Sequence, residues 1–267
     1  MGNINYKHEV EEYKEDLRLN NYAFMKVKDD EIDICRKISL KNAPIYLGRK
    51  VREKELKPHF IKTISLFGNN IIDFYEKNGE NIKIERYRKF NNGELLLTGN
   101  RKDQRVIMTL KQLRQVDLVG YCHELGHLPT MLKPHKNEYY EYSEVFPMFV
   151  EYLAQYLIEP KDFRKIMKEV RLEPTKKSAI YYLQNEQNIK NNNSNKARYL
   201  KFEQRECMKY IRSLDLTLQL IKLYQTNRSA VISEFEKYVY SEKSMKEISQ
   251  TFGVKTDGCT NVLKLIR

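Results

Sequence analysis

The residues best suited to do chemistry are two histidines four positions apart, His123 and His127, and the glutamate that follows the first, Glu124. On an α-helix, residues i and i+4 lie on one face, so both imidazoles can reach one metal ion of tetrahedral preference. Glu124 lies about 100° further round such a helix, which suits it to hold a metal-bound water. This HExxH pattern is typical of zinc hydrolases and predicts one zinc ion.

The geometry requires a helix, and the sequence before the histidines predicts one. Apolar residues recur at roughly helical spacing over residues 110–119, with no proline among them. We therefore predict a helix over residues 111–128. Pro129 should end it directly after His127.

A zinc site of this kind needs a third protein ligand. The extended pattern HExxHxxGxxH is excluded, because Thr130 and Lys133 stand where it requires glycine and histidine. Glu144 and Glu151 lie seven residues apart in an apolar run, where carboxylates are expected to be paired or metal-bound. We predict Glu144 as the ligand and Glu151 as the carboxylate that orients a ligating histidine through its other ring nitrogen. The sequence does not firmly decide between them.

Pro147 indicates where the helix that carries these glutamates begins. Proline lacks a backbone N–H, so it suits only the first turn of a helix. The second helix should start near Phe146, which leaves Glu144 on the segment leading into it.

These residues resemble the thimet oligopeptidase and oligoendopeptidase F family of zinc peptidases. The likeness runs from about residue 85 to the end of the chain. It rests on VGYCHELGH at 119–127, on the glutamates at 144 and 151, and on C-terminal segments at 210–216, 238–244 and 252–254.

The resemblance implies a zincin-type core in which His123, His127 and Glu144 bind zinc and Glu124 is the general base. Zinc with three protein ligands keeps an open position for water, lowers the pKa of that water towards about 7, and polarises the scissile carbonyl. The implied activity is the hydrolysis of oligopeptides.

The chain departs from the family in its C-terminal part and in its length. Family members place a histidine and tyrosines in a late glycine-rich segment, whereas no histidine here follows His135. Tyr210 is the tyrosine best placed to stabilise the oxyanion, with Tyr199 behind it. The gap from His127 to Glu144 is shorter than is typical, so the turn through residues 134–136 must be tight. The whole chain is also shorter, which predicts a more open cleft.

The expected fold is mainly α-helical with a small antiparallel β element. Residues 1–85 are predicted to form an N-terminal helical region, with helices at 6–20 and 59–77 separated around Pro44 and Gly48. Residues 86–267 are predicted to form the zincin-like catalytic region. The polar run QNEQNIKNNNSN at 184–195 is predicted to be a loop between helices.

Two short apolar segments, 94–99 and 106–110, predict a β-hairpin just before the metal helix. Such a hairpin could offer an edge to an extended peptide, as in recognition by strand addition. An ordinary structural hairpin is the equal alternative.

The formal net charge of +12 leaves a further function open. Residues 161–205 carry 12 Lys or Arg against 5 Asp or Glu, so more than half of the excess is local. A basic face could attract acidic peptides or nucleic acid, but no nucleic-acid motif accompanies it, and solvated helix faces are the simpler interpretation. The alternatives to an oligopeptidase are therefore a regulatory peptidase that cuts one dedicated protein and a non-catalytic nucleic-acid-binding protein.

Cysteine usage and hydropathy predict a cytoplasmic protein. The four cysteines are scattered without a CxxC pair, which fits a reducing compartment. The N-terminal residues carry no apolar signal segment, and no apolar stretch is long enough to predict a membrane span. The oligomeric state is not indicated.

Overall fold

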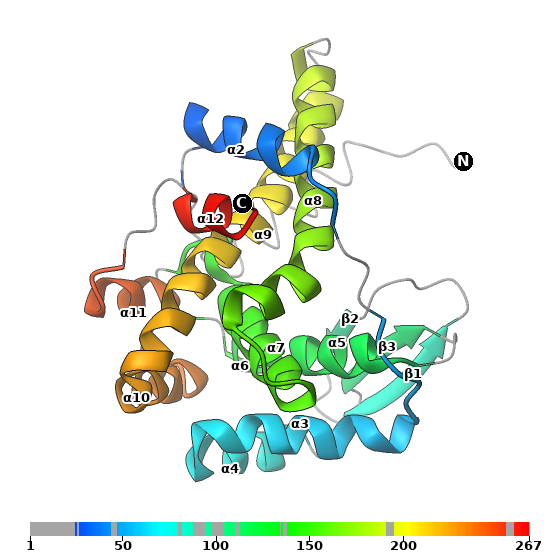
Figure 1. Ribbon diagram of the computed structural model, residues 1–267, viewed down its shortest axis with the longest axis vertical. Helices are drawn as coiled ribbons and strands as arrows, with labels where there is room; N and C mark the ends of the chain where they lie inside the picture. Colours follow the sequence, from blue (N-terminus) through cyan, green and yellow to red (C-terminus); the bar gives the residue numbers. More distant parts are fainter. Residues whose placement is uncertain are drawn as a thin grey trace.

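The computed structural model describes residues 25, 27–43, 47–79, 82–87, 94–97, 104–109, 113–133, 135, 138–190, 195–254 and 259–266. Helices dominate this part of the chain (Figure 1), as the sequence predicts. The predicted helix at 6–20 and Pro44 lie outside the described residues. None of the described helices is both long and apolar enough to cross a membrane.

The elements follow one another in the order shown in Figure 1. They are α2 (Asp29–Ser39), η1 (Glu53–Glu55), α3 (Leu56–Ile64), η2 (Ser65–Phe67), α4 (Asn69–Gly79), β1 (Lys83–Tyr87), β2 (Glu94–Leu97), β3 (Gln104–Thr109), α5 (Gln115–Gly126), α6 (Leu128–Leu132), η4 (Tyr140–Tyr142), α7 (Val145–Ile158), α8 (Phe163–Lys190), α9 (Asn195–Thr226), α10 (Arg228–Val239), α11 (Met245–Thr251) and α12 (Thr260–Ile266).

The single helix predicted at 59–77 is wrong. The chain forms α3 and α4 instead, separated by η2 and by Gly68, whose φ of 104° is open to glycine and rarely adopted by other residues. The apolar spacing continues across the break because residues of both helices, such as Ile64 and Ile71, are buried in one core. Periodicity alone therefore did not reveal the turn.

The predicted hairpin is confirmed, but it belongs to a three-stranded sheet. β2 and β3 pair in antiparallel fashion with Leu95 opposite Val106, and β1, which was not predicted, pairs in parallel with the other side of β3. The central position of β3 leaves the outer sides of β1 and β2 as the sheet edges among the described strands. Strand addition is therefore possible only at those two edges.

The loop predicted at 184–195 is also wrong over most of its length. α8 continues to Lys190 and packs along α9, with which it forms the tall helix pair of Figure 1. Asn185, inside the polar run, is only 2% exposed. Packing against α9 therefore stabilises a helix that composition alone argued against.

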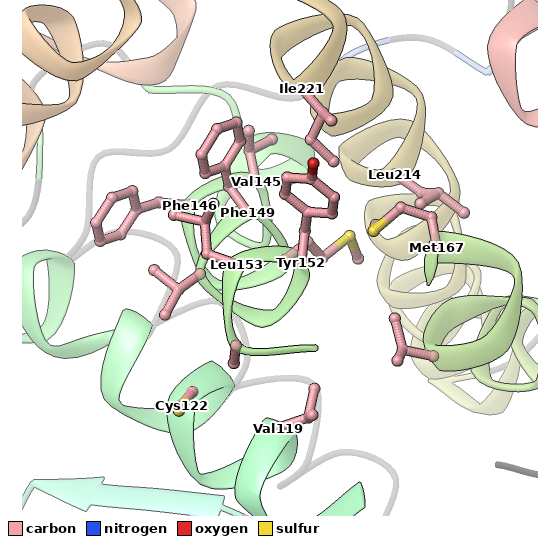
Figure 2. Close-up of a cluster of buried hydrophobic side chains, with 14 of the residues drawn as sticks. Val119, Cys122, Val145, Phe146, Phe149, Tyr152, Leu153, Met167, Leu214 and Ile221 are labelled. Atoms are coloured by element: carbon pink, nitrogen blue, oxygen red, sulfur yellow. The ribbon is translucent and has the colours of Figure 1, made fainter. Parts of the chain in front are cut away.

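α7 forms the centre of the core. All its residues from Val145 to Gln155 are buried, which fits a helix that is apolar nearly all round. In Figure 2, Phe149 and its neighbours on α7 meet Met167 of α8, Leu214 of α9 and Cys122 of α5. α3 packs against both α5 and α7, so helices of the two predicted regions share this core. The core thereby fixes the helices that carry the candidate site.

Candidate metal centre

The end of α5 carries both histidines, His123 in its last turn and His127 directly after it. The helix begins at Gln115, and the side chain of Asp117 caps its first turn by accepting a hydrogen bond from Arg114 N at 2.6 Å. It ends at Gly126, so His127 occupies the C-cap position, and Pro129 stands at the start of the short α6. The rings of His123 and His127 lie edge to face, with centroids 5.1 Å apart.

The end of α5 depends on two close contacts. Pro129 cannot donate the helical hydrogen bond to Leu125 O, and the Tyr75 hydroxyl donates one to that oxygen at 3.1 Å. A Cβ on Gly126 would lie 2.7 Å from Pro147 Cα, closer than side chains tolerate. Gly126 therefore permits α5 to approach the first turn of α7.

Glu144 is the N-cap residue of α7, on the lead-in that Pro147 predicts. Hydroxyl groups of α9 hold the backbone on both sides of it. Ser213 Oγ donates to Glu141 O at 2.6 Å, and Thr217 Oγ1 lies at hydrogen-bond distance from Val145 O, 3.3 Å. These contacts direct the Glu144 side chain towards α5.

The three predicted ligands come together. Glu144 Oε2 lies 3.2 Å from His123 Nε2 and 3.4 Å from His127 Nε2, and the three atoms all lie within 4.8 Å of one another. Ligand atoms that share one zinc ion at about 2.1 Å in tetrahedral geometry are about 3.4 Å apart. Oε2 is buried and has no hydrogen-bond partner among the described residues. Two imidazoles and one unsatisfied carboxylate oxygen fit a zinc ion.

Lys209 of α9 holds the other oxygen of Glu144. Its Nζ lies 3.0 Å from Glu144 Oε1 and 3.0 Å from Glu206 Oε2, and it is 5.0 Å from the ring centroid of Tyr210. Burial alone would raise the pKa of Glu144, but the charge of Lys209 and then that of His127 hold it well below the usual range. Glu144 is therefore an ionised carboxylate with one oxygen paired to Lys209 and the other facing the two histidines.

Arg171 of α8 lies between Glu151 and His123. Its Nε donates to Glu151 Oε2, and its Nη2 lies 2.6 Å from His123 Nδ1. Glu151 Oε2 is 3.8 Å from the same nitrogen, too far for a hydrogen bond. The predicted contact from Glu151 to a ligating histidine is thus replaced by Arg171 in this structure.

Burial shifts the pKa values of His123 and Glu151 in opposite directions. Burial, reinforced by the charge of Arg171, lowers the pKa of His123 to about 3, so the imidazole is neutral at physiological pH, as metal binding requires. Burial raises the pKa of Glu151 to about 7, although the guanidinium of Arg171 opposes the shift.

The site is open on the side of His127 and Glu124. The His127 side chain is 19% exposed, against 4% for Glu144, and Glu124 is partly exposed. Glu124 is close enough for its charge to contribute to the raised pKa of Glu151. Water can therefore reach the cluster from the side on which a general base is predicted.

Tyr210 lies beside the cluster, whereas Tyr199 does not. The charge of Glu144 is the main cause that raises the pKa of Tyr210 to about 12, so the phenol keeps its proton and can donate a hydrogen bond. Tyr210 also lines a hollow of about 360 Å³ between α8 and α9, together with Tyr181 and Glu206. Tyr199 lies about 16 Å further along α9 by helical rise.

Sequence reasoning missed Lys209 and Arg171. Both are cations flanked by buried apolar residues, Met208 beside Lys209 and Leu172 beside Arg171. The reasoning that singled out Glu144, a charge in an apolar run, does not extend to them, because other charged residues stand close by: Glu169 and Glu173 near Arg171, Glu206 and Arg212 near Lys209. Nor would it have named their partners, which lie on other helices.

Comparison with known proteins finds no matching family model, no matching curated protein and no matching solved structure. The resemblance to the oligopeptidase family therefore rests on the motifs alone and stays a prediction.

Proposed function

We propose that this protein is a zinc-dependent metallopeptidase that hydrolyses the peptide bonds of oligopeptides. One observation carries the proposal: His123 Nε2 and His127 Nε2 lie 3.2 and 3.4 Å from Glu144 Oε2, the separations that a tetrahedral zinc ion needs. Glu124 follows the first of these histidines in the sequence and is partly exposed, so water can reach it. On this proposal, α5 and α7 form a zincin-type core.

Bound zinc would polarise the scissile carbonyl and make water acidic enough to attack at neutral pH. Glu124 accepts the proton of the attacking water and then gives it to the leaving amine. The Tyr210 hydroxyl donates a hydrogen bond to the carbonyl oxygen as that oxygen becomes negative. Lys209 keeps Glu144 ionised and turned towards the histidines.

The proposal places the protein in the cytoplasm. All four cysteines, Cys35, Cys122, Cys207 and Cys259, are buried free thiols, which suits a reducing compartment. The proposal assigns the hollow lined by Tyr210 to the oligopeptide.

The proposal is tested by digestion of a peptide library with zinc-loaded protein, read by mass spectrometry. Wild type should cleave, and Glu124→Gln should keep its zinc but lose about 10²–10⁴-fold in rate, as expected for loss of a general base. Glu76→Gln, which changes an exposed glutamate on α4, is the matched control and should cleave normally. A zinc-loaded wild type that cleaves nothing, or an active Glu124→Gln, would contradict the proposal.

A further inference from the structure

The contact between Arg171 and His123 fixes which ring nitrogen carries the proton. Arg171 is 5% exposed, and its Nη2 lies 2.6 Å from His123 Nδ1, much closer than the 3.4 Å that separates it from Nε2. A guanidinium donates hydrogen bonds and cannot accept them. His123 Nδ1 must therefore be the acceptor, and the proton of the neutral imidazole must sit on Nε2, the nitrogen 3.2 Å from Glu144 Oε2.

Zinc binding needs the opposite tautomer. The nitrogen that faces Glu144, and that is grouped with His127 in the candidate site, is Nε2, so the metal needs the lone pair of Nε2. The proton must then be on Nδ1, where it needs an acceptor, usually a carboxylate, a carbonyl or water. Glu151 Oε2, 3.8 Å away, is the carboxylate in position to accept it once Arg171 withdraws from Nδ1.

We propose that Arg171 competes with zinc for His123, and that zinc loading transfers His123 Nδ1 from Arg171 to Glu151. This inference rests on the proposed zinc site. On loading, the hydrogen bond from Arg171 to Nδ1 breaks, the imidazole proton moves from Nε2 to Nδ1 by exchange with solvent, and Nδ1–H donates to Glu151. Arg171 remains bound to Glu151 through Nε.

Two physical effects act in the same direction. The hydrogen bond from Arg171 stabilises the tautomer that cannot bind zinc through Nε2, and the guanidinium charge repels a divalent ion next to it. Zinc is consequently held more weakly than the three ligands alone would hold it. Occupancy of the site then responds to the concentration of free zinc.

The position of Arg171 on α8 suits a side chain that changes partners. Pro174, three residues later, cannot donate to the carbonyl of Val170, so this turn of α8 lacks one helical hydrogen bond. The guanidinium contacts His123 through Nη2 and Glu151 through Nε, so it can keep the second contact when it loses the first.

The test is the zinc dissociation constant, measured by competition with a chelator. Arg171→Met should bind zinc about tenfold more tightly or better, within the range known for groups that contact a metal ligand. Arg171→Lys, which keeps the charge and the donor, should stay near wild type. Lys177→Met, which removes an exposed cation from the same helix, should leave the constant unchanged. Tighter binding is a result that damage to the fold would not give.

A second readout needs no variant. Nitrogen NMR of the metal-free wild type should place the His123 proton on Nε2, and adding zinc should move it to Nδ1. A folded Arg171→Met that binds zinc no more tightly than wild type, or a metal-free His123 protonated on Nδ1, would overturn this inference and leave the proposed function standing. Failure of both wild type and Arg171→Met to bind zinc would overturn the two together.

Discussion

Glu144 divides its two carboxylate oxygens between different partners: Oε1 lies 3.0 Å from Lys209 Nζ, and Oε2 faces the two histidines. The Lys209 side chain is only 11% exposed. A buried carboxylate is thus paired with a cation through one oxygen and turned towards two imidazoles through the other. The candidate metal ligand Glu144 is therefore ionised without any metal present.

Lys209→Met should destabilise the metal-free protein. Loss of one partner leaves Glu144 buried without compensation, which typically costs about 3–5 kcal/mol of unfolding free energy. Zinc should restore much of the loss, because it supplies the missing positive charge. Denaturant unfolding with zinc and with chelator measures both effects. Lys222→Met, at an exposed position on the same helix, should change neither, and an unaltered Lys209→Met would contradict the assignment.

Gly126→Ala should separate α5 from α7. The new Cβ would lie 2.7 Å from Pro147 Cα, so the first turn of α7 must shift, and Glu144 shifts with it. We expect a loss of about 1–3 kcal/mol in unfolding free energy, as for overpacking of a core, together with weaker zinc binding. Gly120→Ala on the same helix is the control.

Apart from its chain neighbours and the backbone of its own helix, no described residue comes within 4 Å of a Cβ added at Gly120, so that substitution should stabilise the helix by roughly 0.5–1 kcal/mol. Thermal unfolding of the two variants compares them directly. Equal stabilities would show that the close approach at Gly126 does not constrain the fold.

Tyr210→Phe should slow hydrolysis without removing the metal. Loss of one donor to the developing oxyanion typically costs about 10²–10³-fold in kcat. Zinc content and KM should change little, because the phenol has no part in holding the metal. Tyr199→Phe should behave as wild type, since Tyr199 lies about 16 Å away along α9. If Tyr199→Phe is the slow variant instead, the oxyanion role does not belong to Tyr210.

The titration of Glu138 should lower the free energy of unfolding as pH rises. Burial raises its pKa to about 7 from an ordinary value of 4.5, although it accepts hydrogen bonds from Met245 N and Lys246 N at the start of α11. Its folded-state pKa lies above its unfolded value, so its contribution is present below pH 4.5 and is lost as pH rises through 7.

The stability of wild type relative to Glu138→Gln should therefore decline by up to about 3 kcal/mol between these limits, at 1.36 kcal/mol per unit of pKa. His135 shifts the other way, since burial lowers its pKa to about 4, but it is common to both proteins and cancels in the difference. Unfolding in chelator across this pH range measures the decline. A difference that grows with pH would contradict it.

The convergence of His123, His127 and Glu144 could be predicted because the sequence signals for it are local. The spacing of His123 and His127 translates directly into one helix face, and Pro147 indicates that Glu144 precedes a helix. The two cations that contact these candidate ligands could not be predicted in the same way. Arg171 and Lys209 reach the site from α8 and α9, and their pairing with His123 and Glu144 depends on how these helices pack.

The errors in the fold have a similar cause. The charged sequence of β1, KIERY, lacks the apolar alternation of a strand, and it is paired by the neighbouring β3. The polar run at the end of α8 is helical because it packs along α9. Tertiary contacts outweighed local preference in both places.

The most direct test of the proposed zinc site is the metal content of wild type, Glu144→Ala and Glu151→Ala, determined by elemental analysis after purification without added metal. We predict about one zinc per wild-type chain, lost in Glu144→Ala and largely kept in Glu151→Ala, because Glu144 Oε2 faces both histidines and Glu151 contacts Arg171. A wild type that holds no zinc and takes up none when it is added would contradict the account.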